Sequence, residues 1–466
     1  MSKLYVFAIG GSGSRVLKSF TMMMAAGVKL GANEVVPIII DPDYTNGDLS
    51  LTVSLMDEYR DIRKKLTFPA ENRNNFFKTE ISPQTQNYSI LIQDTQQKSF
   101  REFIGLDSMD KENKAMAEML FSEKNLNSNM NVGFKGNPNI GSVVLNQIVN
   151  TNDFQSFANS FADGDKIFII SSIFGGTGAS GFPLLLKTLR TPNIFPNHNL
   201  INKAEIGAIT ILPYFMLKND DQSEIDSSTF ISKTKSALAY YENNISLNGQ
   251  INALYFIGDD ITNIYENHEG GYLQKNNAHL IEFLSATAIF DFCNNSYLGN
   301  TTNKELGLND LDNTVSYQSL PNVVSSLIMK PLTQFILMAN AFTFKRDYYT
   351  SKDLAANAKS IGTDVYSSPF CNKLFSFFEN YRIWLKQMKE NKRSLDLFNL
   401  ECGNKPFEVI TGVIAKKIFS RLSDYDLFSD RLNGAINECT SNKSEDKVLE
   451  MYNIATDKLI KEKFNF

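Results

Sequence analysis

The chain has little of several residue types, and each shortage excludes a class of protein. Its 466 residues include four cysteines and no Cys-x-x-Cys pair, so neither a disulfide framework nor a zinc ribbon is expected. The three histidines have no metal-binding spacing. The net charge is −5 and the basic residues are dispersed, so a dedicated nucleic-acid groove is not expected.

Long apolar stretches are also missing. We find no apolar run of the roughly 20 residues that a membrane span requires, and no signal peptide. We therefore expect a cytoplasmic protein without a transmembrane segment. A chain of 466 residues is long enough for two or three domains with substantial cores.

The most informative segment combines a strand, a glycine loop and a helix. The β-branched run 167–173 predicts a buried parallel strand, and an apolar helix is expected to begin near Pro183. Glycine loops before helices bind anions, because free backbone N–H groups and the helix dipole face the charge. A plain tight connection is the alternative. The residues expected to bind phosphate here are Gly175, Gly176, Thr177, Gly178 and Ser180.

The chain begins with the same arrangement. A buried strand at 4–9 precedes a second small-residue loop and an amphipathic helix to about residue 26. Neither loop is a Walker A motif, because no Gly-Lys-Ser/Thr follows. The dinucleotide-binding motif requires a glycine at the position of Val16, so a dinucleotide-binding fold is disfavoured. The candidate nucleotide-binding residues of this loop are Gly10, Gly11, Ser12, Gly13 and Ser14.

A third glycine segment completes a recognisable order. Gly136-Asn137-Pro138-Asn139-Ile140-Gly141 lies between the two loops. Over residues 1–295, the order of these loops resembles that of the tubulin/FtsZ superfamily. There Gly-Gly-Thr-Gly cradles the phosphates of GTP, and an Asn-Pro-x-Val-Gly segment senses the terminal phosphate. Ser14 departs from the family's usual Asn.

The resemblance implies a fold and further phosphate contacts. It implies an α/β protein with a parallel-sheet nucleotide-binding domain, a long central helix, a smaller α+β second domain and a helical C-terminal end. It also places Lys135, Gly136, Asn137 and Pro138 at the terminal phosphate. Lys135 replaces a small residue, and it is either a direct phosphate ligand or a solvated loop lysine.

Two acidic residues follow the strand predicted at 35–40. Asp41 and Asp43 would lie at the binding edge of a parallel sheet. Magnesium favours one or two carboxylates with phosphate oxygens and water, so we expect these two to hold Mg²⁺ through water, with Asp43 also near the nucleotide. An ordinary solvated turn is the alternative.

The base-binding end is less marked. After the strand predicted at 253–257, Asp259 stands where the family has a Pro-Asn-Asp-like turn. A carboxylate can accept hydrogen bonds from guanine N1–H and the exocyclic amine. Asn277 opens the predicted central helix, where the family places a base contact, although Asn is also a common N-cap. Guanine itself, as GTP or GDP, is implied by the resemblance.

The family's acidic hydrolysis loop has no clean match. In the family, this loop follows the central helix and completes the site of the next subunit. Here acidic residues return only at Glu305, Asp310 and Asp312. We name Asp310 and Asp312 as the catalytic candidates, acting on the neighbouring subunit; the alternative is a surface loop with slow or absent hydrolysis.

Four regions are expected. They are a nucleotide-binding domain at 1–275, a central helix and loop at 276–300, a second α/β or α+β domain at 301–420 with strands within 314–345, and a helical extension at 421–466. The whole predicts a GTP- and magnesium-dependent GTPase that polymerises head to tail with itself, with adaptor proteins as possible partners. A non-hydrolysing GTP-binding scaffold and a Rossmann-type enzyme are the alternatives.

Overall fold

The structure is a computed structural model dominated by a parallel sheet. It describes residues 2–131, 133–218, 229–260, 263–265, 270–297, 299, 301–308, 312–351, 361, 363–403, 405–416, 422–464 and 466, without the side chains of 263, 265, 345–351 and 363. Within that range seven strands pair in parallel, in the order β3-β2-β1-β4-β5-β7-β9. They are β1 (Lys3–Ile9), β2 (Glu34–Ile40), β3 (Glu80–Ile81), β4 (Lys166–Ser172), β5 (Ile206–Ile211), β7 (Ala253–Ile257) and β9 (Thr302–Glu305).

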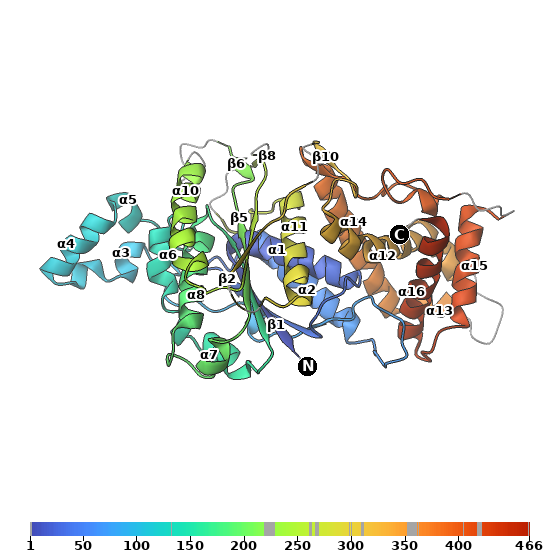
Figure 1. Cartoon of the computed structure of the whole chain (residues 1–466), viewed down its shortest axis with the longest axis horizontal. Helices are drawn as coiled ribbons and strands as arrows, with labels where there is room; N and C mark the ends of the chain where they lie inside the picture. Colours follow the sequence, from blue (N-terminus) through green and yellow to red (C-terminus); the bar gives the residue numbers. More distant parts are fainter. Residues whose placement is uncertain are drawn as a thin grey trace.

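Helices cover both faces of this sheet, as parallel strands require. On one face lie α1 (Gly10–Ala25), α2 (Gly47–Arg63) and α11 (Leu280–Asn294); on the other lie α6 (Pro138–Leu145), α8 (Gly176–Arg190) and α10 (Phe230–Tyr241) (Figure 1). The core strands are apolar and buried, and β4 is buried from Ile167 to Ser172. The predicted α/β class and its parallel sheet are confirmed.

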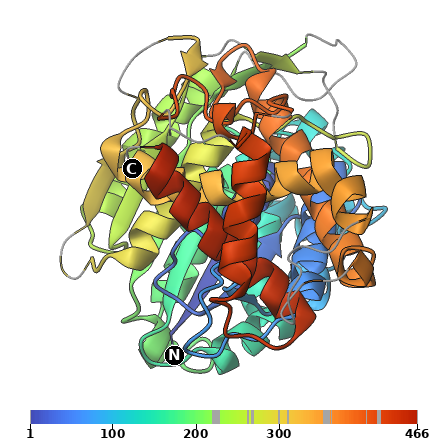
Figure 2. The same cartoon turned by 90° about the vertical axis from the view of Figure 1, so that its right-hand side faces the viewer.

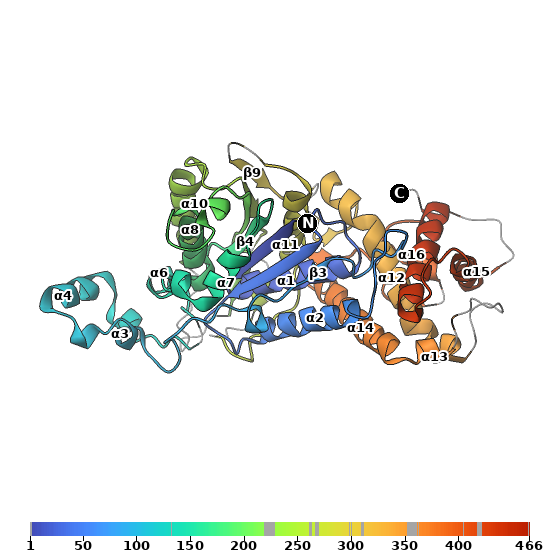
Figure 3. The ribbon, with the colours of Figure 1, turned by 90° about the horizontal axis from the view of Figure 1, so that it is seen from below.

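Three short helices form an arm that projects from the body. They are α3 (Phe100–Phe103), α4 (Lys111–Leu120) and α5 (Glu123–Leu126) (Figures 1 and 3). The arm, residues 98–130, leaves and rejoins the body at one point, because Ser99 and Asn129 form an antiparallel bridge. The remaining short elements here are η1 (Gln86–Tyr88), η2 (Leu106–Ser108), η3 (Ile148–Asn150), α7 (Asn152–Ser160), α9 (His198–Ile201) and η5 (Glu242–Ser246).

The C-terminal third of the chain packs as helices beyond α1 and α2 (Figures 1 and 2). These are α12 (Asn322–Ser351), α13 (Thr363–Tyr366), α14 (Pro369–Lys389), η6 (Pro406–Glu408), α15 (Asp424–Ile436) and α16 (Ser444–Lys463). Two small parallel sheets pair β6 (Phe215–Leu217) with β8 (Asn263–Tyr265) and β10 (Thr314–Val315) with β11 (Ser394–Leu395).

The prediction of strands within 314–345 is wrong except at β10. The apolar run Phe335–Ala339 lies inside the long helix α12, and all five residues are buried against the surrounding helices. A short apolar run does not by itself distinguish a strand from a buried helix.

The segment Asn322–Phe344 is long and apolar enough to cross a membrane, contrary to our expectation. Buried core helices pass the same test, and 56% of its most apolar window is buried.

The single tryptophan joins the two halves of the molecule. Trp384 of α14 is fully buried, and its Nε1 donates to Ser19 Oγ of α1 at 3.2 Å. Its ring stacks on Phe283 of α11, with centroids 5.9 Å apart. Because of these two contacts, Trp384 reports the packing of α14 on α1 and α11.

None of the four cysteines forms a disulfide in the described structure, as predicted.

Candidate functional site

Two helices begin side by side at the centre of the sheet. β1 and β4 are neighbours, and α1 and α8 leave their carboxyl ends onto opposite faces (Figure 1). Such a topological switch point is where open α/β sheets bind ligands. Across these described turns, neither helix has a side-chain cap or an acidic residue in its first turn. Both positive helix ends are therefore suited to an anion.

The helix predicted from Pro183 actually begins at Gly176, so the glycine loop is the first turn of α8. Glycines make this possible because the helix end is pressed against the strand. A Cβ on Gly178 would lie 2.6 Å from the carbonyl oxygen of Ser172, and one on Gly181 would lie 2.7 Å from Ile9 Cγ2. The glycine run at 10–13 is likewise the first turn of α1.

The third glycine segment closes over these two helix ends. A Cβ on Gly176 would lie 3.1 Å from the backbone nitrogen of Gly136, and one on Gly10 would lie 3.4 Å from Thr177 Cβ. Gly133, Lys135 and Gly136 all have positive φ, at 88°, 44° and 75°. This left-handed backbone explains the glycines on either side of Lys135. Three loops, far apart in sequence, thus touch one another.

The acidic pair after β2 lies in the same place, and the two carboxylates differ. Asp43 is engaged by protein donors: Oδ1 accepts from Thr45 Oγ1 at 2.8 Å, and Oδ2 accepts from the backbone of Gly271 at 2.7 Å. Asp41 is buried and accepts from the backbone of Asp43 at 3.0 Å. Burial, with a smaller contribution from the charge of Asp43, raises the pKa of Asp41 to about 7.

One pocket unites most of the residues named from the sequence. Its lining includes Gly10, Gly11, Ser12, Asp41, Asp43, Lys135, Gly136, Gly175, Gly176, Thr177 and Gly178. The four loops therefore lie around one pocket. What they bind stays a prediction.

The other candidates lie elsewhere. Gly13 and Ser14 are buried within α1. Asn137, Pro138 and Ser180 line a neighbouring groove that shares Gly136 with the pocket, and Ser180 Oγ donates to Gly176 O at 2.8 Å. Asp312 is exposed and does not line the pocket, and Asp310 lies outside the described residues.

The two base-binding candidates do not line the pocket. Asp259 forms a buried ion pair with Arg393, and burial raises the pKa of its carboxyl against the opposing effect of that arginine. Asn277 is exposed, and its carbonyl oxygen accepts from Arg15 Nη2 at 2.9 Å. The central helix begins at Leu280, later than predicted, because His279 is its N-cap.

Sequence reasoning missed a polar group at one end of the pocket. Its members are Arg15, Asn46, Asp48, Gln274 and Asn276. Arg15 follows Gly11 by four residues and so shares its helix face, which is a signal that was available. The apolar residues of the lining were also missed: Phe134, Phe174, Phe215, Leu217 and Phe230, as was Ser172.

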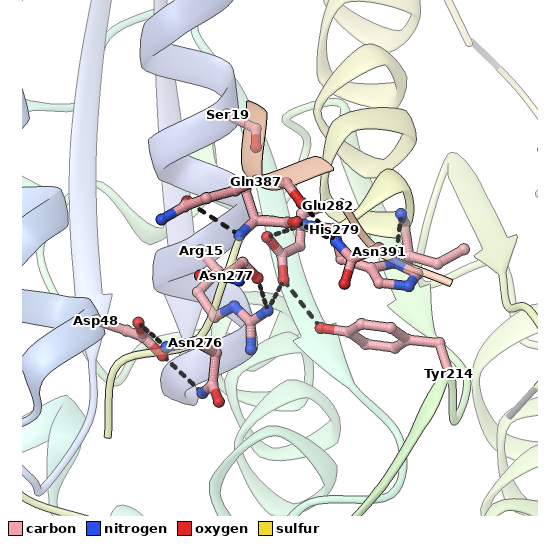
Figure 4. A network of polar contacts seen from close by, with 12 residues as sticks. Arg15, Ser19, Asp48, Tyr214, Asn276, Asn277, His279, Glu282, Gln387 and Asn391 are labelled. Carbon is pink, nitrogen blue, oxygen red and sulfur yellow. Dashed lines mark hydrogen bonds and ion pairs between the residues drawn. The ribbon is translucent and has the colours of Figure 1, made fainter. Parts of the chain in front are cut away.

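A buried network lies directly behind the polar end (Figure 4). Arg15 forms an ion pair with Glu282 of α11, with side chains 7% and 2% exposed. Glu282 also accepts from the His279 backbone and from Tyr214 Oη, both at 3.1 Å. Burial raises the pKa of Glu282, and Arg15 opposes that shift. Burial lowers the pKa of His279 to about 3, so this histidine is a neutral structural cap.

The fold and the site define an α/β protein with a glycine-lined pocket at the switch point of a parallel sheet. No protein-family model and no curated protein matches the sequence. Among solved structures it is similar to two CetZ proteins, which are tubulin/FtsZ-family proteins.

The first of these is CetZ from Methanosaeta thermophila strain DSM 6194. It is 15% identical with a TM-score of 0.29, and the match covers 55% of this chain and 46% of that one. The second is CetZ2 from Haloferax volcanii, in a protofilament with GTPγS bound. It is 12% identical with a TM-score of 0.27, over 56% of this chain and 50% of that one. The match thus spans about half the length of either CetZ protein.

The buried carboxyl of Asp41 predicts a dependence of stability on pH. Its pKa is about 7 in the folded protein and near 4 in an unfolded chain. Between these values only the folded state holds the proton, so the unfolding free energy falls as pH rises from about 4 to 7 and then levels off. Asp41→Asn should remove this component of the fall, measured by urea unfolding at pH 5 and pH 8 without nucleotide or metal. The exposed control Asp163→Asn should keep the wild-type dependence; an unchanged slope in Asp41→Asn would contradict the assignment.

Proposed function

We propose that the chain is a tubulin/FtsZ-like guanine-nucleotide-binding protein that assembles head to tail into filaments and hydrolyses GTP between subunits. The observation that supports this best is the meeting of four loops in one pocket: three follow the strands β1, β2 and β4, and the fourth precedes α6. Their order along the sequence is the order that the resemblance requires.

The pocket suits a polyphosphate. The N-termini of α1 and α8 point their first turns into it without side-chain caps, in the described residues. Backbone N–H groups and two helix dipoles then supply the positive potential. Glycines at 10, 11, 175, 176 and 178 let phosphate oxygens approach the backbone closely.

A cation is needed beside those phosphates because three carboxylates line the same pocket. Of these, Asp41 fits Mg²⁺ best: it is a desolvated carboxyl whose stabilisation calls for a proton or a cation. Asp43 has a structural role instead: its two oxygens accept hydrogen bonds from Thr45 Oγ1 and from the backbone of Gly271, and so connect these two segments. No group of three or more His, Cys, Asp or Glu side chains suited to a metal occurs in the described residues. One carboxylate with phosphates and water is an ordinary magnesium site.

Hydrolysis is assigned to an adjacent subunit. Asp312 is exposed and away from the pocket of its own chain, so any contact with nucleotide would be with that of a neighbour. Its carboxylate, together with Asp310, would orient the attacking water. Head-to-tail contacts are heterologous and do not close, which produces open polymers.

The test combines phosphate release with sedimentation across protein concentrations, using GTP or ATP with magnesium. We expect a specific rate that rises with concentration for GTP, together with pelleting. Asp312→Asn should lower release more than tenfold while leaving GTP affinity unchanged; Glu112→Gln, an exposed change on the arm, should change neither. Tight GTP binding with pelleting and no release would favour the alternative, a non-hydrolysing scaffold. Failure to bind nucleotide at all would reject both.

A further inference from the structure

The arm carries an apolar surface that its own fold does not use. Met116, Met119 and Leu120 of α4 are 61%, 88% and 66% exposed. They follow one another at three- and four-residue spacing, so they lie on one face of the helix and form the arm ridge. Clustered exposed apolar side chains mark interaction surfaces, and methionine adapts well to the shape of a partner.

The core of the arm lies on another side of α4. Ala117 is the buried residue of this helix, and the rings of Phe100 and Phe121 pack with centroids 4.8 Å apart. Arg101 pairs with Glu123 at 3.1 Å and so connects α3 to α5. The arm is therefore held together without the ridge, which no other described part of the chain covers.

A groove of matching character runs between α6, α8 and α10. It has a volume of about 800 Å³, enough for several side chains. Its apolar lining includes Ala179, Pro183, Leu184, Ala237 and Tyr240. An apolar groove between helices is a surface that accepts the apolar face of another helix.

The groove is positively charged. Two lysines, Lys187 and Lys233, line it, and no acidic residue does. Lys233 donates to Gly136 O at 2.9 Å. Lys187 is exposed and pairs with no carboxylate in the described part of the chain. The groove therefore favours an occupant with negative charge beside its apolar face.

The arm ridge has that charge around it. The exposed charged side chains of α4 are Glu112, Glu118 and Lys111, which sum to −1. The remaining lysine of the helix, Lys114, pairs with Asp107 inside the arm at 3.4 Å. Exposed ion pairs contribute little affinity each, so these charges orient the contact and the apolar ridge supplies its strength.

The ridge is out of reach of the groove on its own chain. α4 is the outermost helix of the arm, with α3 between it and the body, whereas the groove lies in the body (Figures 1 and 3). The bridge between Ser99 and Asn129 ties the two ends of the arm together. Asn125 of α5 lines the groove, so the arm and the groove lie at the same end of the molecule.

We propose that two copies of this chain exchange arms, with the arm ridge of each copy lying in the α6–α8–α10 groove of the other. Because arm and groove share one end of the molecule, two copies that face each other make both contacts at once. Such an interface is isologous and closes as a dimer. The inference goes beyond the proposed function, because this dimer requires neither nucleotide nor a filament.

Sedimentation velocity of the full chain, without nucleotide and with EDTA, tests the dimer. We expect a concentration-dependent monomer–dimer equilibrium. Met119→Glu should weaken it at least tenfold, because a carboxylate would be buried in the apolar groove. The control Ile414→Glu changes an apolar residue that is 95% exposed and outside arm and groove, and it should keep the dimer. A monomeric wild type, or a dimer that Met119→Glu leaves unchanged, would overturn the proposal.

A charge reversal tests the orientation of the contact. Lys187→Glu places a carboxylate against the net negative surface of α4 and should weaken the dimer at least threefold. Lys203→Glu reverses an exposed lysine that does not line the groove, so it should have no effect. Equal dimer affinities for the two variants would contradict the assigned groove. Circular dichroism and Trp384 fluorescence confirm that each variant is folded.

Cross-linking identifies the two surfaces directly. Met119→Cys and Ser236→Cys are prepared separately, since Ser236 is an exposed lining residue of the groove. Three of the native cysteines are buried and the fourth is half-buried, so background labelling is low. A flexible bismaleimide should join the two variants when they are mixed, and neither variant to itself. No gain in the mixture would reject the arm exchange and leave the proposed nucleotide-dependent filament untouched, because this sample contains no nucleotide.

Discussion

Gly13→Ala should destabilise the protein by about 3 kcal/mol or more, while Gly11→Ala leaves stability within about 1 kcal/mol. A Cβ on Gly13 would lie 2.8 Å from the carbonyl carbon of Ala8 and 3.3 Å from Ile170 O. These are backbone atoms of β1 and β4, and neither central strand can move without breaking the sheet. The better helix propensity of alanine, worth up to about 1 kcal/mol, is too small to compensate.

Gly11 is the matched control because a Cβ there meets nothing within 4 Å. Its methyl group would instead point into open space beside the pocket, which Gly11 lines. We therefore expect opposite outcomes: Gly13→Ala shifts the urea midpoint of the nucleotide-free protein, and Gly11→Ala mainly weakens nucleotide binding. Trp384 fluorescence follows the unfolding. Equal urea midpoints for the two variants would show that α1 can shift away from β1.

Arg15→Met should cost about 3–5 kcal/mol, because it leaves the carboxylate of Glu282 buried without its cation. The remaining partners of Glu282, the His279 backbone and Tyr214 Oη, are neutral. The double variant Arg15→Met with Glu282→Gln should recover at least half of the loss. The amide oxygen can keep accepting from the His279 backbone, and the amide NH₂ can donate to Tyr214 Oη, whose hydroxyl turns to accept. Urea unfolding of the wild type, both single variants and the double variant completes the cycle.

Independence of the two sites would be the contrary result. If the losses of the single variants simply add in the double variant, Arg15 and Glu282 do not act as a pair. Because Arg15 also lines the pocket, nucleotide affinity is measured on the same four proteins. If the double variant recovers the urea midpoint that Arg15→Met loses but does not recover nucleotide affinity, Arg15 has a direct role at the ligand as well.

The sequence predicted the site where chemistry is local. A strand, a run of small residues and a helix occur within about 20 positions, and the physical reason for their order is the phosphate they would bind. The loops at 10–13 and 175–178 follow this order, and in the structure they line one pocket together with the loop at 133–136 and the acidic turn at 41–43. The strand at 253–257 matches β7 residue for residue.

The sequence could not predict what depends on distant pairing. Asp259 pairs with Arg393, which lies 134 residues later in the chain, and so does not line the pocket. No residue close to Asp259 in the sequence indicates this pairing. The orientation of Asn276 depends on Asp48, which is 228 residues earlier. The misassigned strand at 335–339 has the same origin, since this stretch of α12 is buried on every side and so presents five consecutive apolar residues with no helical period.

The arm has a practical consequence for studying the protein in living cells. Its two ends meet: the backbone of Phe100 donates to Ser128 O at 3.0 Å, and that of Met130 donates to Lys98 O at 3.3 Å (Figure 3). A fluorescent domain inserted at the turn between α4 and α5, around Phe121 and Ser122, would enter and leave through this single stalk. The label would be carried clear of the sheet and of both chain termini. Because the two ends of the arm meet, the whole arm could also be replaced by a tight turn. A variant with a label in the arm and a variant without the arm would then share the same body.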